Sequence, residues 1–187
     1  MPAPPSNGAD SCVRTDYEET ELMTETSLQY LLDRVGIDDA INAYSQALDQ
    51  REWALLDELF TPDARIVLLD RNVLYDPQSL VAALSKNDAT RLGGQHLVGK
   101  SHTRIDGVRA DAVTEVFWTT LQTTTDPEKF LLIRGTGIYR DKLVKGENGW
   151  RIADRELALK SITRDHIAVD DADLESIRYT LGTNWFE

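Results

Sequence analysis

The chain has 187 residues, of which 41% are hydrophobic and 28% charged, which is typical of a folded domain with an apolar core. Its net charge of −12 comes from acids spread along the chain, so we exclude nucleic acid as a principal partner. No apolar run approaches the roughly 20 residues that cross a bilayer, so we expect no membrane partner. The single cysteine, Cys12, excludes an internal disulfide and suits a reducing compartment, so we expect a cytoplasmic protein.

The first segment, residues 1–25, is polar and contains Pro, Ser, Gly, Thr and acids. It has no apolar stretch of the kind found in signal peptides. We therefore expect a disordered N-terminal arm. Met23, just before the first periodic segment, is an alternative translation start, and the sequence leaves both starts open.

A long helical pattern follows the arm. Its first part has four apolar residues at helical spacing: Leu28, Leu31, Leu32 and Val35. After Gly36 the apolar positions adopt a new phase: Ile37, Ala40, Ile41, Tyr44 and Leu48. The change of phase predicts that the helix is kinked or broken at Gly36.

Shorter elements come next. An amphipathic segment over residues 53–60 predicts a second helix, which Thr61-Pro62-Asp63 ends. Residues 64–70 have the composition of a strand, and residues 72–75 form the returning arm of a short hairpin. Asp76-Pro77 is an N-cap followed by proline at the first helical position, which predicts a third helix.

The second half of the chain is rich in β-forming residues. Four long runs have strand composition: 95–105, 112–124, 129–144 and 150–162. Short turns join them, so we expect an antiparallel meander in an α+β fold. Strands longer than the usual five or six residues curl. We therefore predict a cone-shaped α+β barrel, in which N-terminal helices pack on a strongly curved, mainly antiparallel sheet that encloses one pocket.

The tail, residues 165–187, is acidic at first and then apolar. Its apolar residues are Leu174, Ile177, Tyr179, Leu181, Trp185 and Phe186. We expect them to dock on their own domain or on a partner subunit.

Several motifs occur in a characteristic order. They are Leu31–Asp49, Trp53 with Leu56, Phe60-Thr61-Pro62-Asp63-Ala64, Gln95-His96, Gly137-Ile138-Tyr139-Arg140-Asp141 and Gly149-Trp150-Arg151-Ile152. Together they resemble the SnoaL-like, scytalone dehydratase-like branch of the nuclear transport factor 2-like superfamily. The resemblance covers roughly residues 27–162, so we place the SnoaL-like domain at residues 26–164. Such a fold hosts dehydratases, isomerases, cyclases, hydrolases and binding modules.

The resemblance to scytalone dehydratases implies a pair of site residues. The acid at the end of their long helix falls on Asp49, and the histidine of their Gln-His pair falls on His96. Two tyrosines of that pattern are absent, because Leu48 and Leu68 stand near their places. These departures argue against scytalone as the substrate and leave elimination and isomerisation open.

Asp49 and His96 are therefore the candidate acid–base pair. An aspartate that accepts a hydrogen bond from a histidine N–H fixes the tautomer and raises the basicity of the ring. Each residue also has a structural alternative. Asp49-Gln50-Arg51-Glu52 has the pattern of a capping box, and a buried His96 is satisfied by a backbone carbonyl in many proteins.

Other residues are candidates for the cavity wall. Tyr44 lies about one and a half helical turns before the candidate acid, where its hydroxyl can donate to an oxyanion on the substrate. We expect Trp53, Leu68 and Trp118 to contact the substrate, with plain core packing as the alternative for the aromatic residues. Arg134, among apolar neighbours, anchors the substrate if it points inward and is a surface charge if it points outward.

Metal and cofactor sites are not expected. The spacings HxxxH and HxH and paired cysteines do not occur. His102 lies about 20 Å from His96 along a strand, so we place it at the rim or surface, and His166 in the exposed tail. Gly135-Thr136-Gly137 resembles part of a dinucleotide loop, but it lies in the middle of a strand with no helix after it.

The sequence thus favours a cofactor-free lyase or isomerase, of the dehydratase or cyclase type, acting on a small cyclic or polyketide-like substrate of secondary metabolism. His96 is the general base, Asp49 orients it, and Tyr44 is the donor. Two alternatives stay open: a water-activating hydrolase, and a non-catalytic ligand-binding or assembly subunit. In each case we expect a homodimer or higher homo-oligomer, because relatives pair through the outer face of the sheet.

Overall fold

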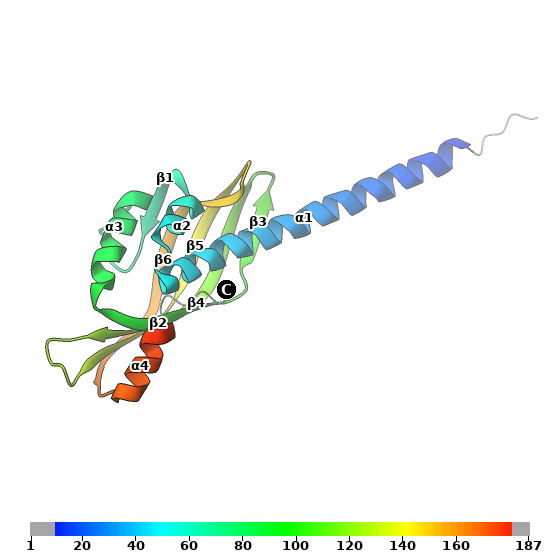
Figure 1. The fold of residues 1–187 in the computed structure, drawn as a ribbon. Coiled ribbons are helices and arrows are strands. Elements are labelled where there is room, and N and C mark those ends of the chain that lie inside the picture. Colours follow the sequence, from blue (N-terminus) through cyan, green and yellow to red (C-terminus); the bar gives the residue numbers. More distant parts are fainter. Residues whose placement is uncertain (1–9, 181–187) are drawn as a thin grey trace, which may run out of the picture. The chain divides into compact units, whose positions relative to one another are not determined.

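The structure is a computed structural model that describes residues 10–180, with the side chains of Glu25 and residues 27–180 (Figure 1). The chain divides into two compact units, residues 1–35 and 36–187. Helix α1 spans Asp10–Gln50, and its part from Gly36 onward belongs to the second unit.

The start of α1 differs from the expectation. Residues 10–25, expected in a disordered arm, are helical, and residues 1–9 lie outside the described residues. This segment contains Glu, Leu and Met, which favour helix. The helix also continues through Gly36 without a break. A glycine costs a helix only about 1 kcal/mol, and here Trp150 Cδ1 lies 3.0 Å from where a β-carbon would stand.

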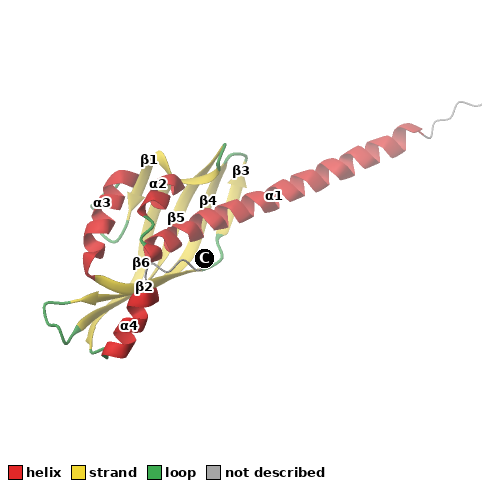
Figure 2. Cartoon of the chain, viewed as in Figure 1, coloured by secondary structure: helices red, strands yellow, loops and turns green. Residues whose placement is uncertain are grey.

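The second unit is built on one sheet (Figure 2). Its strands are β1 (Phe60–Val67), β2 (Arg91–Val98), β3 (His102–Asp106), β4 (Arg109–Thr123), β5 (Phe130–Gly146) and β6 (Gly149–Ile167). Their order is β1-β6-β5-β4-β2, with β3 also paired to β4, and only β1 and β6 run parallel. The α+β fold with a mainly antiparallel, curved sheet is confirmed. The sheet is open, however, and does not close into a barrel.

Two predicted strands have different bounds. The run 95–105 is divided between β2 and β3, which pair with successive parts of β4. Strand β1 starts at Phe60 rather than at residue 64 and therefore contains Pro62. It lies at the edge of the sheet, where a residue without a backbone N–H is tolerated.

The remaining helices are short. They are α2 (Trp53–Leu59), α3 (Pro77–Asn87), the 3-10 turn η1 (Asp88–Thr90) and α4 (Asp171–Thr180). Asp76 caps α3 as predicted, since its Oδ1 accepts the Ser79 N–H at 2.8 Å. In the tail, Leu174 of α4 packs with Leu121 and Phe130 of the sheet, whereas Trp185 and Phe186 lie outside the described residues. None of the helices in the described range is both long and apolar enough to span a bilayer.

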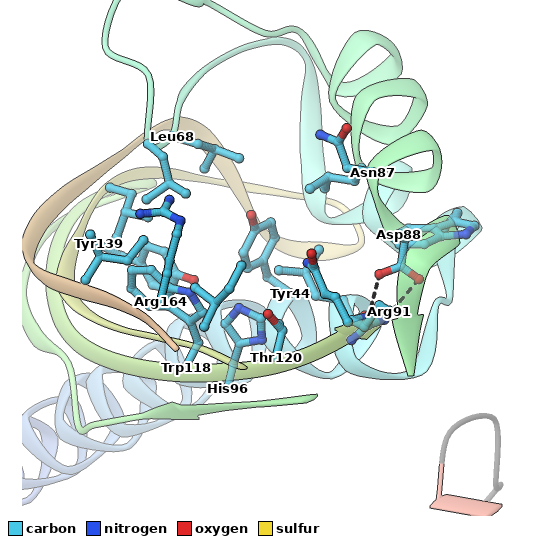
Figure 3. Close-up of a pocket in the computed structure, with 18 residues that line it drawn as sticks. Tyr44, Leu68, Asn87, Asp88, Arg91, His96, Trp118, Thr120, Tyr139 and Arg164 are labelled. Carbon is cyan, nitrogen blue, oxygen red and sulfur yellow. Dashed lines mark hydrogen bonds and ion pairs between the residues drawn. The ribbon is translucent and has the colours of Figure 1, made fainter. Parts of the chain in front are cut away.

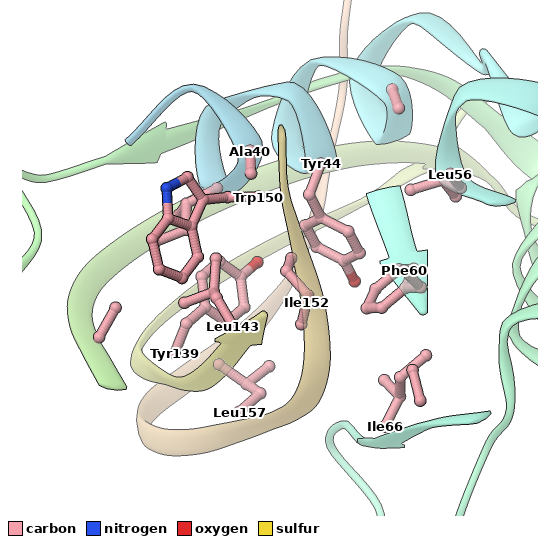
Figure 4. Packing of buried hydrophobic residues seen from close by; sticks show 14 of the residues in the cluster. Ala40, Tyr44, Leu56, Phe60, Ile66, Tyr139, Leu143, Trp150, Ile152 and Leu157 are labelled. Carbon is pink, nitrogen blue, oxygen red and sulfur yellow. The ribbon is translucent and has the colours of Figure 1, made fainter. Parts of the chain in front are cut away.

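The main core lies between the helices and the concave side of the sheet (Figure 4). Its buried side chains include Ile37, Ile41 and Tyr44 of α1, Phe60 and Ile66 of β1, and Tyr139, Leu143 and Ile152 of β5 and β6. The apolar phase that begins at Ile37 is therefore the face that α1 buries.

A charged pair lies inside this core. Arg155 Nε and Nη2 each donate to the Asp141 carboxylate at 2.7 Å, and both side chains are fully buried. The guanidinium carbon stands 4.2 Å from the ring centroid of Tyr44 and 4.3 Å from that of Tyr139. Burial acts to lower the pKa of Arg155, but the adjacent Asp141 carboxylate, together with Tyr44 and Tyr139, raises that pKa overall. Arg155 therefore stays charged.

We predict that Arg155→Met destabilises the fold by about 3–5 kcal/mol, because it leaves the Asp141 carboxylate buried without its partner. Urea denaturation measures the free energy of unfolding. The double variant Arg155→Met/Asp141→Leu removes both charges and should be more stable than Arg155→Met alone. As a control, Lys160→Met breaks the exposed Lys160–Glu115 pair and should cost no more than about 1 kcal/mol.

Candidate active site

The end of α1 places the candidate acid. Arg51 has a φ of 61°, and the Glu52 N–H donates to the Ala47 carbonyl at 2.9 Å, which together end the helix in a left-handed turn. Asp49 thus lies in the last turn of α1. The alternative role as a cap of α2 is not seen, because Glu52 is the N-cap residue and makes no side-chain cap bond.

Arginines hold this end of α1 against the start of β2. Arg91 Nη2 donates to the Leu48 carbonyl at 2.7 Å, and Arg51 Nη2 donates to the Arg91 carbonyl at 2.7 Å. The Asp88 carboxylate forms ion pairs with both arginines. These contacts fix the distance between the last turn of the helix and the strand that carries His96.

Asp49 and His96 meet at this junction. The His96 backbone N–H donates to Asp49 Oδ2 at 2.8 Å, and His96 Nδ1 lies 2.6 Å from Asp49 Oδ1. An ionised carboxylate only accepts hydrogen bonds, so the proton of the neutral ring lies on Nδ1. The two side chains are 14% and 13% exposed. No backbone carbonyl is needed to satisfy Nδ1, and Nε2 is the nitrogen left for a ligand.

His96 lines a cavity of about 240 Å³ (Figure 3). The apolar part of the wall is Leu48, Trp53, Leu68, Leu69, Leu84, Trp118, Ile133, Leu157 and Ile162. The polar part is Tyr44, Asn87, Asp88, Arg91, His96, Thr120, Gln122, Tyr139 and Arg164. Four residues expected at the wall on sequence grounds, Tyr44, Trp53, Leu68 and Trp118, are therefore on it.

Arg134 lies outside the cavity, which corrects the expectation that it anchors a substrate. Its side chain is 51% exposed, and Nη2 pairs with Asp165 Oδ2 at 2.7 Å. Successive side chains of a strand point to opposite faces of the sheet. Ile133 faces the cavity, so Arg134 faces away from it.

One row of residues across the sheet supports the imidazole. His96 of β2 pairs with Trp118 of β4, Trp118 with Gly135 of β5, and Gly135 with Ile162 of β6. The His96 and Trp118 rings stack with 6.4 Å between centroids and 17° between planes. Gly135 makes room for the indole, because a β-carbon there would lie 2.1 Å from Trp118 Cζ2. Gly135 therefore lets the Trp118 indole pack against the middle of β5.

Tyr44 is held rigidly at the wall. Its ring meets those of Phe60 and Tyr139 edge to face, each at 5.8 Å, and lies against the Arg155 guanidinium. Burial raises the pKa of Tyr44, an effect that nearby Arg155 partly opposes. Its hydroxyl therefore stays protonated and can act as a hydrogen-bond donor.

Sequence reasoning missed six polar wall residues: Asn87, Asp88, Arg91, Thr120, Gln122 and Arg164. Thr120 and Gln122 stand at alternate positions after Trp118 and therefore face the same side of the sheet. The sequence pattern alone could have identified these two residues. His102 and His166 are exposed, as predicted. In the described part of the chain, no three His, Cys, Asp or Glu side chains come together as metal ligands.

Comparison with known proteins identifies the family. The model of the SnoaL-like domain matches residues 29–156. The chain belongs to the SnoaL-like family. Uncharacterized protein Rv2910c of Mycobacterium tuberculosis is 30% identical over 134 residues, which cover 69% of this chain and 86% of that protein.

Solved structures of other proteins show the same fold. A Novosphingobium aromaticivorans protein provisionally named a scytalone dehydratase aligns with a TM-score of 0.64 and 21% identity, over 77% of this chain and 93% of its own. The type 2 hexachlorocyclohexane dehydrochlorinase LinA aligns with a TM-score of 0.64 and 15% identity, over 78% of this chain and 99% of its own.

We predict that Gly135→Ala displaces the Trp118 indole from the His96 ring, because the added methyl group occupies its place. Tryptophan fluorescence and the His96 ring resonances should both shift while circular dichroism stays unchanged. Gly146→Ala, on the same strand, meets no atom closer than 4.0 Å and serves as the control. Unchanged His96 resonances in Gly135→Ala would contradict this role of the glycine.

Proposed function

We propose that the protein is a cofactor-free lyase of the dehydratase type, in which His96 is the general base. The substrate is a small cyclic or polyketide-like molecule with an acidic proton next to a carbonyl group. The observation that carries the proposal is the double hydrogen bond between Asp49 and His96 at the wall of a largely apolar cavity.

The geometry supports a base rather than an acid. Asp49 accepts the Nδ1 proton, which leaves the Nε2 lone pair of the neutral ring as the acceptor for a substrate proton. When Nε2 takes that proton, the Asp49 carboxylate stabilises the imidazolium. Asp49 is therefore a positioning residue, and His96 is the group that contacts the reacting atoms.

The steps of an elimination can be assigned to the described side chains. Nε2 of His96 removes the proton from carbon, and the electron pair moves onto the carbonyl oxygen as an enolate. Tyr44 lines the same cavity and is the candidate donor to this oxyanion. The enolate then expels a β-hydroxyl group, which takes the proton from His96 and leaves as water. Return of the proton to another carbon gives isomerisation instead.

The names of two structural relatives favour elimination. A dehydratase removes water and a dehydrochlorinase removes hydrogen chloride, and each reaction breaks a carbon–hydrogen bond. With identities of 21% and 15%, these relatives support the choice of reaction class but not a substrate.

The tautomer provides a test that needs no substrate. We predict that nitrogen NMR of the neutral His96 ring shows the proton on Nδ1 in the wild-type protein. In Asp49→Asn the amide oxygen still accepts the backbone N–H, while the amide nitrogen donates to Nδ1 and forces the proton onto Nε2. A wild-type ring with its proton on Nε2 would overturn the assignment of His96 as the base.

Turnover is the second test. The probes are cyclic β-hydroxy ketones in heavy water, with deuterium uptake and enone formation followed by NMR. We predict that His96→Ala lowers both rates by about 10²–10⁴, the usual contribution of a general base. Asp49→Asn should lower them comparably although the hydrogen bonds remain. His102→Ala, an exposed histidine on β3, is the matched control.

Equal rates in the wild type and His96→Ala, including no enzyme-dependent rate in either, would contradict the proposal. Hydrolysis is distinguished by product analysis in heavy-oxygen water. Incorporation of solvent oxygen would indicate that His96 activates water instead of removing a proton from carbon.

A further inference from the structure

One cation of the cavity has no counter-ion in the described part of the chain. Arg164 of β6 lines the cavity, as Leu68 does (Figure 3). No hydrogen bond or ion pair joins its guanidinium to another described residue. The other arginine of the wall, Arg91, is different, because Asp88 and the Leu48 carbonyl already occupy it.

Asp165, the acid next to Arg164 in the sequence, does not form an ion pair with it. Asp165 follows it directly, but alternation along β6 places the two side chains on opposite faces of the sheet. Asp165 pairs instead with Arg134 on the face that points away from the cavity. Arg164 is thus a cation on the cavity wall that no described acid neutralises, whereas the acid of the same wall, Asp88, is paired with Arg51 and Arg91.

We propose that Arg164 binds a carboxylate of the substrate, so that the protein acts on acids rather than on neutral ketones. The inference rests on the proposed function, since it takes the cavity to be the substrate site. A guanidinium binds a carboxylate through two parallel hydrogen bonds, which fix orientation as well as position.

The sheet register places Arg164 in a different row from His96. Arg164 pairs with Ile133, and Ile133 with Thr120, in the row next to the one that holds His96 and Trp118. Three strand spacings separate β6 from β2, which is about 14 Å along the curved surface. A carboxylate at Arg164 is therefore bound from a different strand and row than His96, and its binding energy orients the carbon next to Nε2.

Ligand-observed NMR with benzoate and benzamide tests the inference, because the two probes differ little in shape and by one charge. We predict that the wild-type protein prefers benzoate about 10- to 100-fold, as expected for charge-assisted hydrogen bonds. Arg164→Gln should abolish this preference and leave benzamide binding unchanged. The control is Arg134→Gln, which also removes one positive charge, but from β5 and from the face of the sheet that points away from the cavity. This variant should keep the preference for benzoate.

Equal or undetectable binding of the two probes to the wild-type protein would contradict the inference, as would a preference that survives in Arg164→Gln. Equal losses in Arg164→Gln and Arg134→Gln would replace it with a general effect of net charge. The assay involves no turnover, so His96→Ala should keep the benzoate preference. Failure of the base mechanism and failure of the carboxylate site are thus separate outcomes.

Discussion

The Asp49 carboxylate joins the end of a helix to a strand, and the candidate site depends on this junction. One oxygen accepts a backbone N–H and the other accepts the imidazole proton of the same residue, His96. A carboxylate in the last turn of a helix faces the negative end of the helix dipole. The two N–H groups of His96 offset that repulsion. Asp49 therefore orients the His96 ring, and the backbone N–H of His96 in turn holds the Asp49 carboxylate in place.

The cavity wall and the protein core share their aromatic residues. Tyr44 and Tyr139 line the cavity on one side and enclose the Arg155 guanidinium on the other. Because Asp141 holds that guanidinium with two hydrogen bonds, neither ring can move without disturbing a buried ion pair. The candidate donor at Tyr44 is thereby as rigid as the core, which favours stabilisation of a developing charge at a fixed position.

Local patterns predicted much of this architecture, and the misses have non-local causes. The order of motifs identified Asp49 and His96 although 47 positions separate them. Arg134 was misplaced because β5 has apolar residues on both faces near it, so that its sequence does not indicate which face is inside. The glycine at position 36 leaves room for Trp150, a neighbour from a distant strand that the local sequence does not reveal. Arg164 was missed because its place on the cavity wall depends on the cross-strand register with Ile133.

The hydrogen bond from the His96 backbone N–H to Asp49 protects an edge of the sheet. Strand β2 ends the hydrogen-bonded path of the sheet, and its His96 N–H donates to Asp49 rather than to β4. An outward N–H on a terminal strand is a template on which another chain can add a strand and begin to aggregate. Here the Asp49 carboxylate accepts the hydrogen bond of this N–H, so the N–H is not available to another chain. The same side chain thus serves both the His96 ring and the edge of the sheet, and only a substitution that removes the acceptor altogether, such as Asp49→Ala, leaves this N–H open to another chain.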